Sequence, residues 1–187
     1  NIALLGASGA GKTTLAEAML VEGKKIPRAG RVEDGSTVCD FDDLEKELQH
    51  SVDSALANVD HGGCHLNIID TPGRADFFGK AIGPMSAVET VVVVLDAGAG
   101  IQPITRRAMA RAGEHGVPTA IVINKMDGAS DLAGTLSSIQ EAFGSNCVPI
   151  NVPAGGGSTV ARCFLSGDGE CDLGDMADFH TAIVDQV

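Results

Sequence analysis

The feature that most constrains this chain is a glycine-rich stretch that directly follows an apolar run near the start of the sequence. Residues 1–13 read NIALLGASGAGKT, and the stretch Gly6–Thr13 fits the pattern G-x-x-x-x-G-K-[ST] at every fixed position. Glycines in such a stretch let the backbone turn tightly, so that several N–H groups converge on phosphate oxygens. The sequence therefore predicts a loop, between a strand and a helix, that binds the phosphates of a nucleoside triphosphate.

The lysine and the threonine that close this pattern have separate expected roles. Lys12 is expected to reach the β- and γ-phosphates, and the Thr13 hydroxyl is expected to bind Mg²⁺. A glycine-rich turn without a ligand is disfavoured because both residues are in place, and GASGAG does not have the G-x-G-x-x-G spacing of a dinucleotide site. Residues 14–20 are good helix formers, and the N-terminus of their helix would add partial positive charge behind the phosphates. The predicted nucleotide-binding residues of this motif are Gly6, Ala7, Ser8, Gly9, Ala10, Gly11, Lys12, Thr13 and Thr14.

A second motif, Asp70-Thr71-Pro72-Gly73, follows an apolar segment that is predicted to be a strand. An acidic residue at the C-terminal end of such a strand is where P-loop proteins hold Mg²⁺, often through a water molecule. We therefore expect Asp70 to hold the metal through water and the Gly73 amide to sense a γ-phosphate. Thr71 and Pro72 complete this set of candidate cofactor-binding residues.

A third motif, Asn124-Lys125-Met126-Asp127, follows a second buried strand and selects the base. The Asp127 carboxylate can accept hydrogen bonds from guanine N1–H and the exocyclic amine, whereas adenine would leave it unpaired. Such a site rejects the wrong ligand by about 10⁴-fold or more. Asn124 is expected to tie this loop to the phosphate loop, and the Lys125 stem to lie over the base. A P-loop kinase or ATPase is disfavoured by this motif.

Composition excludes several classes of function. The formal net charge of -12 and the absence of Trp and Tyr argue against direct binding of nucleic acid, which requires basic residues or stacking platforms. Five cysteines without a C-x-x-C pair suit free thiols in a reducing compartment. No apolar run reaches transmembrane length and no signal peptide is visible. Because the sequence starts without Met, directly on a strand, we expect it to be a fragment.

The remaining pattern is that of an α/β domain. A hairpin is predicted over residues 52–69, and its His61, Cys64 and His65 are interpreted as turn and strand residues because no further ligand cluster supports a metal site. A helix after Gly73 is predicted to break near Gly83-Pro84. Strands are further predicted over residues 91–95, 119–123, 148–152 and 160–165, and helices over residues 105–115, 131–143 and 176–187.

With the three motifs placed, the chain resembles the GTPase domain of translation factors, most closely elongation factor G and elongation-factor-G-like proteins. The resemblance is carried by GASGAGKTTL, by residues 30–38, by IIDTPGRADF and by VINKMD, and it extends from Asn1 to about Val152. It implies a P-loop NTPase fold, a Ras-like GTPase domain with a mostly parallel sheet flanked by helices. Residues 1–146 would form the GTP-binding domain, and residues 147–187 the incomplete start of the subdomain that elongation factor G inserts.

The chain departs from this family at three places. The smallest change is in the phosphate loop, where the family often has Asp at the position of Ser8 or Gly9. Where the family has Arg-Gly-Ile-Thr in its first switch, this sequence has Leu48-Gln49-His50-Ser51, so Ser51 is the candidate hydroxyl for the metal. After Asp-Thr-Pro-Gly the family usually has a His that orients the attacking water, and this sequence has Arg74. The candidates for catalysis are therefore Lys12, Gly73 and Arg74, with Arg74 acting as an arginine finger or, alternatively, as a surface residue that points at Asp76.

The resemblance implies a protein that binds and hydrolyses GTP with Mg²⁺ and acts as a conformational switch on the ribosome, in the cytoplasm and away from membranes. The alternative is a GTP-binding ribosome-protection or regulatory module with little intrinsic hydrolysis. The ribosome would be contacted through the full-length protein, since this acidic segment is not expected to bind nucleic acid.

Overall fold

The computed structural model describes residues 1–186, and the chain forms two compact units, Asn1–Asn124 and Lys125–Val187. The predicted boundary between residues 146 and 147 concerned the start of an inserted subdomain, and it stays a prediction. The first unit carries the first two motifs, and the third motif lies across the junction of the two units.

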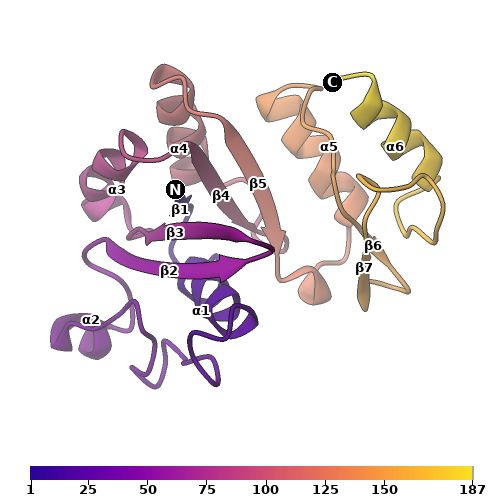
Figure 1. The fold of residues 1–187 in the computed structure, drawn as a ribbon. Coiled ribbons are helices and arrows are strands. Elements are labelled where there is room, and N and C mark those ends of the chain that lie inside the picture. The colour runs from indigo at the N-terminus through magenta and orange to yellow at the C-terminus, as the bar shows by residue number, and fades with distance from the viewer. Residues whose placement is uncertain (187) are drawn as a thin grey trace. The chain divides into compact units, whose positions relative to one another are not determined.

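The first unit is built on a five-stranded sheet with the strand order β2-β3-β1-β4-β5 (Figure 1). Strand β1 pairs in parallel with β3 and β4, and β4 pairs in parallel with β5, whereas β2 runs antiparallel to β3. The predicted mixed α/β fold with a mostly parallel sheet is therefore confirmed. The strands are β1 (Ile2–Leu5), β2 (Ala55–His61), β3 (Cys64–Asp70), β4 (Thr90–Asp96) and β5 (Thr119–Asn124), and the helices are α1 (Lys12–Glu22), α2 (Asp43–Leu48), α3 (Phe78–Met85) and α4 (Pro103–Glu114).

Helices cover both faces of this sheet because its central strands carry apolar side chains on both sides. Successive residues of a strand point to opposite faces. Accordingly, Ala3 and Leu5 of β1 pack in a cluster with α3 and α4, whereas Leu4 packs in a second cluster with α1. Strand β1 thus separates two hydrophobic cores, and the loop that follows it is anchored from both sides.

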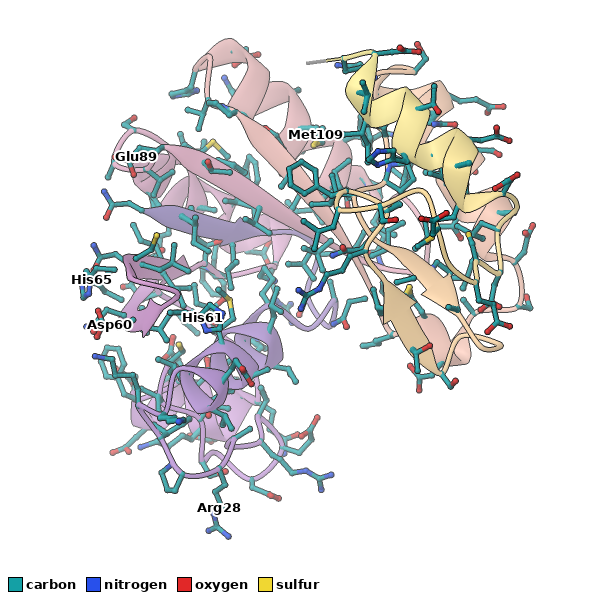
Figure 2. All side chains as sticks on the ribbon, turned by 45° about the vertical axis from the view of Figure 1, so that its right-hand side comes forward. Arg28, Asp60, His61, His65, Glu89 and Met109 are labelled. Atoms are coloured by element: carbon teal, nitrogen blue, oxygen red, sulfur yellow. The ribbon has the colours of Figure 1, made fainter. Side chains whose placement is uncertain are left out.

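The β2–β3 hairpin turns at two glycines. His61 pairs with Cys64, and Gly62 and Gly63 have φ values of 57° and 80°, which glycine adopts without steric cost. The hairpin predicted over residues 52–69 is present, with β2 ending at His61 and β3 beginning at Cys64. Figure 2 shows Asp60 and His65 near one another on this hairpin, where His65 Nδ1 lies 2.6 Å from Asp60 Oδ1. Within residues 1–186 no cluster of three or more His, Cys, Asp or Glu side chains could hold a metal ion.

The break predicted near Gly83-Pro84 corresponds to the end of α3 at Met85, although Pro84 itself lies inside the last turn of the helix. A proline in a helix cannot donate to the carbonyl four residues earlier, which here is that of Lys80. That carbonyl instead accepts a hydrogen bond from the Ser54 hydroxyl at 3.2 Å. Ser54, just before β2, satisfies the group that Pro84 leaves open, so the helix continues to Met85.

Within its described residues, the second unit contains two short strands, two longer helices and a small core to which β6, β7 and α6 contribute. Its strands are β6 (Val152–Ala154) and β7 (Thr159–Ala161), which pair antiparallel, and its helices are α5 (Leu132–Phe143) and α6 (Met176–Val184). The strands predicted over residues 148–152 and 160–165 are wrong for most of their length, since only Val152, Val160 and Ala161 are in strands. Residues 148–150 instead form a loop whose Pro149 carbonyl accepts a hydrogen bond from the Cys163 thiol at 3.1 Å. The C-terminal helix was predicted to residue 187, which lies outside the described residues.

No helix within residues 1–186 combines the length and the apolar character needed to span a membrane.

Candidate functional site

The glycine-rich loop lies between the end of β1 and the start of α1, and its shape requires glycine. Gly11 has a φ of 94°, and a Cβ atom added there would lie 2.2 Å from Asn124 Nδ2. The same Asn124 amide donates a hydrogen bond to the Ala10 carbonyl at 2.9 Å. The end of β5 is therefore held directly against the loop, 114 residues away along the chain.

Lys12 is almost completely buried and folds back over the loop. Its Nζ donates to the carbonyl oxygens of Gly6 at 3.1 Å and Ala7 at 3.0 Å. Burial lowers the pKa of Lys12, and the nearby Asp70 and Asp40 carboxylates oppose this effect. The ammonium group of Lys12 thus lies inside the loop. An anionic ligand bound there would take the place of the two carbonyl oxygens as its hydrogen-bond acceptor, and it would add a full negative charge.

Thr13 and Asp70 meet where α1 begins and β3 ends. The Thr13 hydroxyl donates to Asp70 Oδ2 at 2.6 Å, and Ser51 Oγ lies 3.4 Å from Thr13 Oγ1. Asp70 is 1% exposed, and burial raises the pKa of its carboxyl to about 6. Within residues 1–186, Asp70 Oδ1 is the one fully buried side-chain N or O atom without a hydrogen-bond partner.

This group of oxygens fits a hard divalent cation. Mg²⁺ prefers carboxylate, hydroxyl and water oxygens, and it commonly uses one or two carboxylates together with substrate phosphates. An unpaired buried carboxylate oxygen costs stability unless something binds it. The donor set of Thr13, Asp70 and Ser51 would supply what Mg²⁺ requires next to a nucleotide.

Thr71 and Pro72 are buried, and they fix the chain where it leaves β3. The Thr71 hydroxyl donates to the Leu4 carbonyl of β1 at 2.7 Å. Two residues later the Gly73 carbonyl accepts a hydrogen bond from Ser8 N–H at 2.9 Å. A Cβ atom at residue 73 would lie 2.4 Å from Lys12 Nζ and 2.6 Å from Ser8 N, so only glycine fits this contact.

Arg74 lies outside this cluster. Its side chain is about half exposed, and a guanidinium nitrogen lies 3.7 Å from a carboxylate oxygen of Asp76. In this structure Arg74 therefore has the orientation of a surface residue that points at Asp76, which was one of the two alternatives.

Three buried carboxylates that the sequence did not single out hold the segment Gly30–Asp53. Glu17 of α1 is fully buried and accepts hydrogen bonds from the Gly30 and Val38 N–H groups at 2.7 and 2.6 Å. Glu45 of α2 accepts from the Val52 and Asp53 N–H groups at 2.9 and 3.0 Å. The third carboxylate, Asp40, accepts from the hydroxyls of Thr37 and Ser51 at 2.9 and 2.7 Å.

Two of these carboxylates had a sequence signal. Glu17 follows Thr13 by four residues and precedes Leu20 by three, which places it on the buried face of α1. Asp42 and Glu45 form a capping box, a recognisable start for α2. For Asp40 only the contact with Thr37, three residues earlier, is local, and its contact with Ser51, eleven residues later, had no signal in the sequence.

The motif Asn124-Lys125-Met126-Asp127 begins in the first unit and ends in the second. Asn124 closes β5, Lys125 adopts the left-handed conformation with a φ of 57°, and Met126–Gly128 forms a 3₁₀ turn that exposes Asp127. The left-handed residue turns the chain sharply after the strand.

In this structure a glycine-rich loop with Lys12 and Thr13 connects a strand to a helix. The loop lies beside the acidic end of a neighbouring strand in a mostly parallel sheet. This arrangement defines the class of P-loop nucleoside-triphosphate-binding proteins. Comparison with known proteins narrows this class, because the family model described as the elongation factor Tu GTP binding domain matches residues 1–184. The chain therefore belongs to this family of translational GTPases.

Relatives of the chain are translation factors. An elongation factor G-like protein of Mycobacterium tuberculosis (strain ATCC 25618 / H37Rv) is 40% identical over 158 residues, which are 84% of this chain and 22% of the relative. Elongation factor G of Mycoplasma pneumoniae is 35% identical over 156 residues, 83% of this chain and 23% of that protein. This chain thus spans between a fifth and a quarter of the length of these relatives.

Solved structures agree with this assignment. A crystal structure of a protein from Thermus thermophilus aligns with 98% of this chain and 30% of that one, with a TM-score of 0.88 and 29% sequence identity. A bacterial selenocysteine-specific elongation factor aligns with 76% of this chain and 22% of its own, with a TM-score of 0.58 and 25% identity.

Proposed function

We propose that this chain binds GTP with Mg²⁺ and hydrolyses it as the conformational switch of an elongation-factor-G-like translation factor on the ribosome. The observation that carries the proposal is the contact between the Thr13 hydroxyl and the Asp70 carboxylate, beside the buried Lys12. These are the positions at which P-loop NTPases hold their metal and their phosphates. Mg²⁺ would neutralise charge on the β- and γ-phosphates.

The residues of the chain would then act mainly by positioning. The N–H groups of the loop Gly6–Thr13 would bind phosphate oxygens, and Lys12 would exchange its two carbonyl acceptors for the β- and γ-phosphates. Gly73 would offer its amide to the γ-phosphate. GTP would order the residues near Ser51 and Gly73, and hydrolysis would release them.

Guanine would be selected by the motif that follows β5. Asp127 would accept from N1–H and the exocyclic amine, the Lys125 stem would lie over the base and Met126 would complete the loop. The hydrogen bond from Asn124 to Ala10 supports this interpretation, because it links the strand that carries the base motif to the phosphate loop.

A second function, a GTP-binding ribosome-protection or regulatory module with little hydrolysis of its own, is favoured by Arg74. A guanidinium group offers only donors and cannot accept a proton at neutral pH, so it cannot orient water as a His acceptor nitrogen does. Its guanidinium group is about half exposed and lies 3.7 Å from the Asp76 carboxylate. The missing Arg-Gly-Ile-Thr stretch, replaced by Leu48-Gln49-His50-Ser51, points the same way.

Single-turnover hydrolysis of GTP by the purified protein, with and without ribosomes, separates the two functions. A ribosome-stimulated rate supports the switch, and binding without stimulated turnover supports the second function. We expect slow hydrolysis without ribosomes, and we expect Arg74→His to change turnover mainly when ribosomes are present. Arg106→His, an exposed change on α4, is the matched control. Equally tight binding of ATP and GTP would contradict both functions.

The remaining proposals concern location and partners. We place the protein in the cytoplasm, where ribosomes work, without a membrane partner. The ribosome would be contacted through the full-length protein, since the charge of -12 does not favour direct binding of nucleic acid by this segment.

A further inference from the structure

Asp40 stands at the centre of a chain of short contacts that ends at the proposed metal site. It is 2% exposed although it carries a carboxylate, and it comes from the segment Gly30–Asp53 rather than from any of the three motifs. One oxygen accepts from Thr37 Oγ1 at 2.9 Å and the other from Ser51 Oγ at 2.7 Å. The position of the Ser51 hydroxyl therefore depends on Asp40.

The protons of the two neighbouring hydroxyls are already committed. A hydroxyl has one proton to donate, and ionised carboxylates only accept. Ser51 gives its proton to Asp40, and Thr13 gives its proton to Asp70. The two hydroxyl oxygens lie 3.4 Å apart, a contact in which either hydroxyl could be the donor. The contacts with the carboxylates are shorter, 2.6 Å for Thr13 and 2.7 Å for Ser51, and are assisted by charge. With both protons on the carboxylates, the two hydroxyl oxygens turn lone pairs toward each other.

Lone pairs that face each other repel unless a positive charge lies near them. Asp70 Oδ1 is a further buried oxygen of this cluster, and it has no hydrogen-bond partner. Together these oxygens form a group of acceptors without donors, which a divalent cation satisfies. Asp40 contributes to this group by turning the Ser51 proton away from it.

We propose that Asp40 is a positioning residue for the Mg²⁺ of the bound nucleotide: it orients Ser51 so that the hydroxyl oxygen, and not its proton, faces the cation. This inference rests on the proposed function, since it presupposes a nucleotide with its metal at Thr13 and Asp70. Asp40 acts through Ser51, so its effect exists only when the Ser51 hydroxyl is present.

The test is the Mg²⁺ concentration that half-maximally slows release of a fluorescent, non-hydrolysable GTP analogue from the purified protein. Asp40→Ala and Ser51→Ala are each expected to raise this midpoint about tenfold. The double variant is expected to raise it by no more than about tenfold, because both changes remove one interaction. Asp40→Asn keeps an acceptor for the Ser51 proton and is expected to stay within about twofold of wild type.

Asp43→Ala is the matched control, because Asp43 lies three residues away in α2 with a fully exposed side chain. A merely structural role for Asp40 would lower thermal stability without moving the Mg²⁺ midpoint, and that result overturns the proposal. An additive double variant, shifted about a hundredfold, also overturns it, because Asp40 would then act on the cation independently of Ser51.

Two further outcomes remain decisive. If Asp40→Ala does not fold, Ser51→Ala carries the test alone, and an unchanged midpoint for that variant contradicts the proposal. If wild type itself releases the analogue at the same rate with Mg²⁺ and with EDTA, the proposed metal site is wrong, and the role of Asp40 is wrong with it. Mg²⁺-dependent release in wild type with an unchanged Asp40→Ala midpoint rejects the role of Asp40 alone.

Discussion

The carbonyl oxygen of Gly73 accepts a hydrogen bond from the N–H of Ser8, and this single contact joins the residue after β3 to the phosphate loop. In this state an amide of the loop is occupied by the protein itself. A phosphate oxygen that is to bind the Ser8 amide must displace the Gly73 carbonyl. The contact therefore links occupancy of the loop to the conformation of the residues after Pro72.

The first prediction tests how tightly Gly73 packs. Gly73→Ala would place a methyl group 2.6–2.7 Å from the loop backbone at Ser8 and Ala7, and backbone cannot move aside cheaply. We expect the free energy of unfolding of the nucleotide-free protein to fall by about 1–3 kcal/mol. The matched control is Gly79→Ala in α3, where nothing lies within 4 Å of an added Cβ. That change should stabilise by about 0.5–1 kcal/mol. Urea unfolding measures the free energy of unfolding of both variants. Equal changes in the two variants would contradict the close packing of Gly73 against the loop.

The second prediction concerns the charge of Asp70. Burial raises its pKa to about 6, above the usual 3.8, so the folded state holds the proton more tightly than the unfolded state does. The contribution of this group to stability is therefore largest below pH 4 and is lost as the pH rises to about 6. In EDTA at pH 7.5 we expect Asp70→Asn to raise the free energy of unfolding by about 1–3 kcal/mol.

At pH 5 the same substitution should have about half of this effect, because the folded carboxyl is then mostly protonated while the unfolded one, with its usual pKa of 3.8, is already mostly ionised. Unfolding in denaturant at the two pH values measures the difference. The variant should also lose Mg²⁺-dependent retention of the nucleotide, so that stability and binding change in opposite directions. A variant that is less stable at pH 7.5 would show that the charge is better solvated than its burial indicates.

The third prediction concerns the base. We expect Asp127→Ala to abolish the preference for guanine over hypoxanthine and adenine bases while the phosphate contacts persist. Competition of GDP, IDP and ADP for the protein measures this preference. Asp131→Ala is the control: it removes the cap of α5, where the carboxylate accepts from Gly134 N–H at 2.7 Å. It should cost about 0.5–2 kcal/mol of stability without changing base preference. A wild-type protein that binds ADP as well as GDP would contradict the assignment of this motif.

The fourth prediction concerns thiol reactivity. Burial, with the negative charges of nearby carboxylates, raises the pKa of Cys39 to about 12, whereas Cys64 is exposed in the hairpin. Since the thiolate is the reactive form, we expect iodoacetamide at pH 8 to label Cys64 at least about a hundredfold faster than Cys39. Peptide mass spectrometry resolves the two sites, and labelling in denaturant provides the reference. Equal rates in the folded protein would show that the segment around Cys39 opens readily.

The sequence predicted those features that depend on neighbouring residues. The phosphate loop, the strand that ends in Asp70 and the strand that ends in Asn124 each combine an apolar run with polar residues directly after it. Parallel strands with crossover helices bring these ends to one edge of the sheet, so the local patterns were sufficient.

Features that depend on distant partners were not predicted. The carbonyl of Lys80, which Pro84 leaves without its helical donor, accepts from the distant Ser54, and the short strand at Val152 pairs with Ala161. The carboxylates that hold the segment Gly30–Asp53 bind N–H groups up to 21 residues away. Helical spacing and a capping box mark Glu17 and Glu45 as helix residues, but neither pattern identifies the N–H groups that they bind.

The hydrogen bond from the Thr71 hydroxyl holds the end of β3 against β1. It therefore determines the point after which the backbone that leads to Gly73 can change conformation. The chain up to residue 71 belongs to the rigid sheet, with Thr71 fully buried and its hydroxyl on the Leu4 carbonyl. Any rotation of the Gly73 region therefore has its pivot at the bonds around Pro72, whose ring already restricts one torsion. Phe78, Ala81 and Met85 hold α3 in the core against β1, so the segment that can follow a phosphate oxygen is limited to the few residues between Thr71 and Phe78.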